Sequence, residues 1–286
     1  MSQKLLIFTV LFSLSFLHAS EWSLLKSVET GPDGVHLKSP TAIYFHKDGN
    51  KFYIVDSGNA RLISYSSNGK PLKLFNAGGQ LKVPAGMIKD AYGNLWIIER
   101  ATNSLVYINL REKKIVSKEI AYQGKPLFLG KIERIGDKIA ILDKYTGRVF
   151  IVNENFSVEK CLFPKRKDFK GFFDIKIKGD TLYAMETISG RIFRCKLRGD
   201  TFKFVNPKKK FIEPVSFDID RSGNIYILDR YLEKIFIFNP EGIPLNSKLK
   251  GGNRAGELYY PWYIRIINDK IFIVNEGNGR VDIFRY

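Results

Sequence analysis

Short apolar segments separated by polar turns run through the chain, and the same arrangement recurs six times. Each unit has a mostly apolar strand, a short polar turn and a second strand. The units lie at 52–65, 95–108, 139–152, 182–195, 225–238 and 271–284. A further strand precedes each unit and ends in Gly, Asn or Asp residues typical of tight hairpins, and a fourth strand follows. Four short strands in every roughly 43 residues predict the blades of a β-propeller.

An acid or amide closes the first strand of each unit, and a base usually follows five positions later. The closing residues are Asp56, Glu99, Asp143, Glu186, Asp229 and Asn275. The later residues are Arg61, Ser104, Arg148, Arg191, Lys234 and Arg280. We expect the acid to pair with the base across the turn and to accept hydrogen bonds from backbone donors that would otherwise lack partners.

The two ends of the chain predict how the ring closes. The sixth unit stops at Tyr286 after its third strand, and a spare strand lies at 22–29. The segment that follows it, GPDGVHLKSP (31–40), aligns with GNRAGELYYP (252–261) at Gly, Leu and Pro. The sequence therefore predicts an all-β, six-bladed propeller with four-stranded antiparallel blades. Its N-terminal strand would complete the last blade and remove an exposed edge.

The first 20 residues have the pattern of a secretory signal peptide. Lys4 precedes an uncharged apolar run, Leu5 to Leu17, and the small residues Ala19 and Ser20 follow. A membrane anchor is the other interpretation, but spanning a bilayer takes about 20 apolar residues. We expect 1–20 to be a signal peptide, 21–286 to be the propeller, and the mature protein to be secreted or periplasmic. Cys161 and Cys195 would then meet conditions that permit a disulfide, or they are two separately buried thiols.

The run SPTAIYFHKDGNKFYIVDSGNARLISYSSNGKPLKLF (39–75) resembles an NHL repeat, and the sixth repeat, with NEGNGRVDIF, matches nearly as well. The resemblance covers almost all of 22–286 and implies a six-bladed propeller. It assigns a structural role to the turn residues Asp56, Asn59, Arg61, Asn275, Asn278 and Arg280. It leaves the function open, because NHL-type propellers include RNA-binding modules, extracytoplasmic binding proteins and a few lyases.

Composition adds a strong positive charge. The chain has 46 Lys and Arg against 29 Asp and Glu, a formal net charge of +17. Three basic clusters occupy the links between successive blades, which emerge on one face of a propeller. They contain Lys165, Arg166, Lys167, Lys170, Lys208, Lys209, Lys210, Lys248, Lys250 and Arg254. They predict a surface for an anionic partner such as a lipid head group, an acidic glycan or an acidic protein. The signal peptide argues against a nucleic acid as the partner, and solvated lysines are the alternative.

Aromatic residues gather at the entrance of the sixth blade, on the face of the basic links. These residues are Tyr259, Tyr260, Trp262 and Tyr263. They form either a binding platform for a sugar or peptide beside the basic links, or packing between blades. We include them in the predicted binding face.

The innermost strands line the channel of a propeller, and aligning them places charged residues near the axis in blades 3 to 6. These residues are Lys131, Glu133, Asp174, Lys176, Asp218 and Arg265. They either pair with one another, as buried charges must, or Glu133, Asp174 and Asp218 hold a divalent cation. The sequence predicts no other metal site or cofactor, because His36 and His46 are the only histidines of the mature chain.

Two functions follow from these features. The first is a secreted or periplasmic binding or scaffold module without catalysis, which holds a protein or an anionic envelope component on one propeller face. The alternative is a divalent-metal-dependent lactonase or lyase of the gluconolactonase-like type, with its site in the central channel. That family is similar in blade number, but no motif here matches it residue by residue. The chain also lacks G-x-S-x-G, H-E-x-x-H and phosphate-loop motifs.

Overall fold

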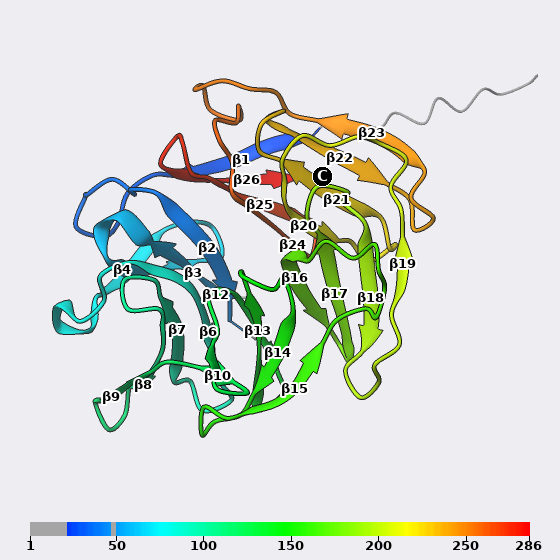
Figure 1. Cartoon of the computed structure of the whole chain (residues 1–286). Helices are drawn as coiled ribbons and strands as arrows, with labels where there is room; N and C mark the ends of the chain where they lie inside the picture. Colours follow the sequence, from blue (N-terminus) through cyan, green and yellow to red (C-terminus); the bar gives the residue numbers. More distant parts are fainter. Residues whose placement is uncertain (1–21, 47–49) are drawn as a thin grey trace, which may run out of the picture.

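Six four-stranded antiparallel sheets stand in a ring around a central channel (Figure 1). This computed structural model describes residues 22–46 and 50–286. The predicted signal peptide at 1–20 and part of the first turn of blade 1 lie outside the described residues. The predicted all-β, six-bladed propeller is confirmed.

The first three blades follow one another along the chain. Blade 1 contains β2 (Pro40–Phe45), β3 (Lys51–Asp56), β4 (Arg61–Ser66) and β5 (Pro71–Phe75). Blade 2 contains β6 (Pro84–Lys89), β7 (Leu95–Glu99), β8 (Ser104–Asn109) and β9 (Lys114–Lys118). Blade 3 contains β12 (Leu129–Ile135), β13 (Lys138–Asp143), β14 (Val149–Val152) and β15 (Val158–Leu162).

The last three blades continue the ring. Blade 4 contains β16 (Phe172–Lys178), β17 (Thr181–Glu186), β18 (Ile192–Lys196) and β19 (Lys203–Val205). Blade 5 contains β20 (Pro214–Ile219), β21 (Ile225–Asp229), β22 (Lys234–Phe238) and β23 (Pro244–Lys248). Blade 6 contains β24 (Tyr263–Ile267), β25 (Lys270–Asn275), β26 (Arg280–Arg285) and β1 (Ser23–Val28). A small hairpin, β10 (Ala121–Tyr122) and β11 (Lys125–Pro126), and two short 3-10 turns, η1 (Ser57–Asn59) and η2 (Ala77–Gly79), complete the described elements.

The N-terminal strand closes the ring as the sequence predicts. Strand β1 pairs antiparallel with β26, and Figure 1 shows the blue and red strands side by side. The Ser27 hydroxyl donates to Asp282 at 2.5 Å, and Val28 is buried in the apolar cluster between blades 1 and 6. Joining the first and last strands removes the free edges that a half-built blade would leave.

The core lies between neighbouring blades rather than within them. Apolar clusters link each adjacent pair of blades around the ring. Between blades 1 and 6, for example, Phe52 stacks on Tyr65 at 5.3 Å and meets Phe272 edge-on at 5.3 Å. Because every blade buries both of its faces, the ring holds its innermost strands in fixed register.

The two faces of the propeller carry different turns. We call the face with the turns after each second strand and the links between blades the link face, and the opposite face the hairpin face. The acid that closes each second strand accepts backbone N–H groups of the link face. Glu99, for instance, accepts from Lys82 and Val83 at 2.9 and 2.8 Å. This confirms the predicted role as an acceptor of backbone donors.

The predicted pairing with the base five positions later is found in two blades. The Arg61 guanidinium donates to Asp56 at 2.6 Å, and Arg191 donates to Glu186 at 2.6 Å. In blade 6 the expectation is wrong, because Arg280 donates instead to Asp282 at 3.0 Å. The other turn residues that the resemblance singled out also make scaffold contacts, since the Asn59 and Asn278 side-chain amides donate to backbone carbonyls.

The two cysteines do not form a disulfide. Cys161 and Cys195 are free thiols; Cys161 packs between blades 2 and 3, whereas Cys195 donates to the Lys196 carbonyl at 3.3 Å. Burial raises the pKa of both thiols.

No helix within residues 22–46 and 50–286 is long and apolar enough to cross a membrane.

Candidate functional site at the link-face mouth of the channel

The charged residues that the sequence places near the axis do converge there, and most are paired. The Lys176 ammonium lies 2.7 Å from one Asp174 oxygen, and both side chains are fully buried. That oxygen also accepts from the Ser216 hydroxyl at 2.7 Å and from the Phe217 amide at 3.2 Å. Burial opposes ionisation, but the Lys176 ammonium holds the pKa of Asp174 below its usual range. Asp174 is therefore a carboxylate built into the channel wall.

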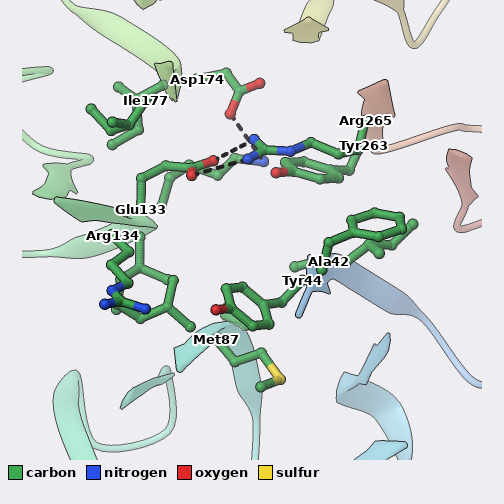
Figure 2. A pocket seen from close by; sticks show the side chains of 17 residues that line it. Ala42, Tyr44, Met87, Glu133, Arg134, Asp174, Ile177, Tyr263 and Arg265 are labelled. Atoms are coloured by element: carbon green, nitrogen blue, oxygen red, sulfur yellow. Dashed lines mark hydrogen bonds and ion pairs between the residues drawn. The ribbon is translucent and has the colours of Figure 1, made fainter. Parts of the chain in front are cut away.

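A second pair crosses the channel. Arg265 of blade 6 donates to both oxygens of Glu133 of blade 3, at 2.7 and 3.4 Å (Figure 2). Lys178 lies 2.8 Å from Asp218, which also accepts the backbone amides of Ile219 and Ile266 at 2.8 and 2.7 Å. Burial opposes the charge on Arg265, but Glu133 raises the pKa of that guanidinium well above its usual value.

This pairing does not fit a divalent cation. Glu133, Asp174 and Asp218 each face a Lys or Arg nitrogen within 2.8 Å, whereas Ca²⁺ takes six to eight oxygen ligands. In the part of the chain that the structure describes, no group of three or more His, Cys, Asp or Glu side chains is placed to hold a metal. The channel carboxylates are therefore ion-pair partners rather than a metal site.

Two cavities lie along the channel, and Lys131 lines both. The cavity toward the hairpin face measures about 170 Å³, and Tyr44, Glu133 and Arg265 line it (Figure 2). Two of its polar pairs are formed, because Tyr44 donates to the Lys89 carbonyl at 3.3 Å and Glu133 binds Arg265. Lys131 and Asp174 also line it, and Lys131 Nζ and Asp174 Oδ1 have no hydrogen-bond partner among the described residues.

The cavity toward the link face is larger, about 300 Å³, and differs in character. Blades 2, 3, 4 and 6 contribute to its wall. The side chains that give it charge and apolar surface are Arg100, Lys131, Lys144, Lys170, Tyr145, Phe172, Phe173 and Trp262. No carboxylate lines this cavity among the described residues.

Two backbone features shape the link-face cavity. The first strands of blades 1 to 5 carry a register shift just after they begin, and in blades 3 and 4 the extra residues are Gly130 and Phe173. Such a bulge re-aims a side chain, and Phe173 lies against Trp262, with ring centroids 5.9 Å apart. At Gly130 a Cβ atom would come within 2.5 Å of the Lys144 side chain. Glycine there leaves room for Lys144 at the wall.

Two nitrogen atoms at this cavity lack hydrogen-bond partners. Arg100 Nε and Lys131 Nζ are buried, and neither is hydrogen-bonded among the described residues. Lys131 Nζ lies 3.9 Å from Asp174, too far for a hydrogen bond. It also lies over the rings of Trp262 and Tyr263, whose centroids are 5.0 and 4.9 Å away.

The same environment lowers the pKa of both Lys131 and Arg100. Burial lowers the pKa of Lys131 to about 8, although Asp174 opposes the shift. Neighbouring cations, Arg100 and Lys144 among them, lower it further. Burial also lowers the pKa of Arg100, against the opposing charge of Glu276. An anion in this cavity would relieve both the missing hydrogen bonds and the repulsion between cations.

The predicted aromatic cluster is divided between two environments. Tyr263 is buried in the channel, with the Lys176 ammonium 4.0 Å from its ring centroid, and Trp262 lies at the cavity. Tyr259 and Tyr260 are exposed on the link face and meet edge-on at 4.8 Å. The cluster is thus neither one platform nor one core.

The predicted basic links lie on the link face, and their charges are not equally available. Arg166 is held by Asp168 at 2.9 Å, and Lys250 pairs with Glu257 at 3.3 Å. Lys170 lines the cavity. The exposed side chains of Lys165, Lys167, Lys208, Lys209, Lys210 and Arg254 extend over the links, and Lys248 is partly buried at the end of β23.

Sequence reasoning missed Arg100, Lys144 and Phe173. Arg100 and Lys144 each directly follow the acid that closes a second strand, and Arg230 does so in blade 5. Arg230 pairs with Glu276 at 2.6 Å and lies 5.1 Å from the Trp262 ring centroid. Aligning this turn position across the blades would have found three cations, Arg100, Lys144 and Arg230, beside Ser57, Thr187 and Glu276.

Comparison with known proteins supports the fold. No family model and no curated protein sequence matches the chain. A virginiamycin B lyase structure from Staphylococcus aureus is 14% identical over 86% of this chain and 80% of that one, with a TM-score of 0.63. A gluconolactonase from Xanthomonas campestris is 13% identical over 92% and 88%, with a TM-score of 0.65. The Cps50 (Swd1) β-propeller domain from Myceliophteria thermophila is 10% identical over 93% and 99%, with a TM-score of 0.66.

At these identities the likeness establishes the fold alone. The chain is a six-bladed β-propeller, and membership of the NHL family is not confirmed.

Proposed function

We propose that the link-face cavity binds a small organic anion with a planar apolar body. The observation that carries this proposal is the pair of buried nitrogens without hydrogen-bond partners, Arg100 Nε and Lys131 Nζ. Buried donors are costly to leave unpaired, so a site that keeps two of them beside a cavity is suited to an acceptor ligand. The aromatic walls, Phe173 and Trp262, fit the apolar part of that ligand.

The comparisons favour a small molecule in the channel over a site confined to the outer surface. The similar structures include a lyase and a gluconolactonase, both enzymes on this fold. This likeness supports the central channel as the site, as expected for the alternative function, the lactonase or lyase. The divalent metal expected for that function does not fit the residues present.

Turnover of the bound anion is a second candidate, and it rests on Lys131. An amine with a pKa of about 8 is partly neutral near neutral pH. It is therefore suited to accept a proton from a substrate or from an attacking water. The Lys131→Met variant should then lose turnover of lactones or esters of organic acids, while Arg100 still holds their acid products. Equal turnover by Lys131→Met and the wild type would exclude this role.

Thermal unfolding of residues 21–286 with a panel of anions tests binding directly. Benzoate, naphthoate, citrate and phosphate separate the demand for charge from the demand for a ring. We expect the aromatic acids to raise Tm in the wild type, because a ligand that binds only the folded state stabilises it. Arg100→Met should abolish most of the rise, and Lys208→Met, on an exposed link, should leave it unchanged. A rise that Arg100→Met retains would contradict the proposal.

We also propose that the protein works outside the cytoplasm, on the pattern of residues 1–20. N-terminal sequencing of the protein recovered from the periplasm or medium should begin near residue 20 or 21. An intact Met1 on all recovered protein would argue against export.

A further inference from the structure

The link face has a second feature, which apart from Tyr145 lies outside the cavity: large apolar side chains are exposed at its turns. In blades 3 to 6 these side chains are Phe128, Tyr145, Ile188, Ile212, Tyr231, Tyr259 and Tyr260. The turns of the hairpin face expose Tyr92, Leu110 and Ile243, spread over blades 2 and 5. Exposed apolar residues that gather on one face indicate an interaction surface.

Three of these residues occupy one position in the repeat. Tyr145, Ile188 and Tyr231 each lie two residues after the acid that closes the second strand, and their exposures are 83%, 72% and 64%. Blades 1 and 6 have glycine at this position, Gly58 and Gly277. The fold therefore tolerates a residue without a side chain here, and burial does not explain the bulky ones.

The backbone at Ile188 strengthens the argument. Its φ is 67°, in the left-handed region that a β-branched residue rarely adopts. Such a conformation is costly and is found where function demands it. An isoleucine that is both exposed and in this conformation contributes nothing to the core, so its side chain has a role at the surface.

The charges around this arc are mostly basic, and all but one of the acids named below are engaged. Asp168 binds Arg166 and Arg191, and Glu257 binds Lys250. Glu276 binds Arg230, and Glu213 stands exposed beside Ile212. Five exposed lysines on the adjoining links have no ion pair among the described residues: Lys165, Lys167, Lys208, Lys209 and Lys210. The surface is apolar at its turns and positive at its links.

We propose that the link face of blades 3 to 6, which we call the docking arc, binds an acidic protein that presents a protruding segment. Tyrosine and isoleucine side chains would give the contact its apolar centre, and the lysines would form a charged rim. The surface is hollowed rather than flat. A groove of about 420 Å³ lies between Phe128, Tyr145 and Arg148. A protruding protein segment fits this groove, whereas a flat membrane surface would leave it unfilled.

A random copolymer of glutamate and tyrosine serves as the defined probe, measured by fluorescence anisotropy at low and high salt. We expect it to bind, and to bind about tenfold more weakly to the double variant Ile188→Gly, Tyr231→Ser. Tyr92→Ser, at an exposed turn of the hairpin face, is the matched control and should bind like the wild type. Ile188→Gly relieves the backbone, so the double variant should keep its Tm.

The remaining outcomes decide against the proposal. Equal binding of the double variant, or no binding of the copolymer even at low salt, would overturn the docking arc. Vesicles of anionic phospholipid that bind as tightly, with the same loss in the double variant, would assign the surface to a membrane instead. Neither Ile188 nor Tyr231 lines the anion cavity. The Arg100→Met test therefore fails or succeeds independently of this one.

Discussion

The two ends of the channel differ in whether their charged side chains are paired. Toward the hairpin face, Glu133 and Arg265 bind each other at 2.7 Å. Arg100 Nε toward the link face, and Lys131 Nζ at the boundary of the two cavities, have no hydrogen-bond partner among the described residues. The first arrangement stabilises the ring, and the second costs stability and leaves donors for a ligand. The difference locates the site where a count of charges could not.

The contrast is sharpest at two lysines that face the same carboxylate. Lys176 lies 2.7 Å from Asp174 and Lys131 lies 3.9 Å from it. We expect Lys176→Met to lower the free energy of unfolding by about 3–5 kcal/mol, because Asp174 would stay buried without its closest cation. Urea denaturation measures the change.

Lys131→Met is the matched control for that experiment. It removes a buried amine that has no hydrogen-bond partner and leaves Asp174 with Lys176, Ser216 and the Phe217 amide. Its free energy of unfolding should stay within about 1 kcal/mol of the wild type or rise. Equal losses in both variants would remove the distinction between a structural and a functional lysine.

The pair across the channel offers the next largest effect. Arg265→Met should destabilise the protein by about 2–3 kcal/mol, because Glu133 would lose its bidentate partner while remaining buried. Differential scanning calorimetry measures it. Arg221→Met, which removes an exposed hydrogen bond to Asn268 on the hairpin face, should change stability by less than about 0.5 kcal/mol. If the two variants unfold alike, the pair does not tie the blades together.

The pH dependence gives the smallest effect and the most specific one. The protonated form of Lys131 attracts an anion, so affinity for benzoate should fall by about threefold to tenfold as pH rises through about 8. Isothermal titration calorimetry from neutral to alkaline pH follows it. In Lys131→Met the affinity should be lower and nearly constant across this range. A wild-type affinity that does not change with pH would show that Lys131 does not face the ligand.

Stability should move in the opposite direction. The pKa of Lys131 is lowered from 10.5 to about 8 in the folded protein. Between these values the unfolded chain holds a proton that the folded chain has lost, so this residue's contribution to stability rises with pH. Below about 8 both states are protonated and the cost of burying the charge is fully present. The protonated form of Lys131 thus favours anion binding and destabilises the folded state, as expected of a residue in a binding site.

The fold was predictable because it is periodic. Acids such as Asp56 and Asp229 recur at a nearly constant spacing, and the spare strand at 22–29 matches the strand that blade 6 lacks. Aligning the innermost strands also placed Glu133 and Arg265 near the axis. Their mutual pairing was not predictable, since it joins blades 3 and 6 across the ring and the alignment carries no distance.

The site itself was only partly predictable. Lys131 and Trp262 were singled out, one as a channel residue and the other in a surface cluster, and the structure brings them together. Arg100 was missed because it lies in a turn that repeats in every blade and therefore resembles scaffold. Arg100 differs from the equivalent turn residues of other blades in the side chains that surround it. Those neighbours come from tertiary packing and cannot be read from the local sequence pattern.

The most direct test of the account is a crystal structure of residues 21–286 soaked with 4-bromobenzoate, in which the anomalous signal of bromine locates the ligand. We predict the bromine in the link-face cavity, against the rings of Phe173 and Trp262, and the carboxylate within hydrogen-bond distance of Arg100 and Lys131. Bromine in the hairpin-face cavity beside Glu133, or only on the exposed lysines of the links, would contradict the central claim that the unpaired donors at the link-face mouth are the binding site.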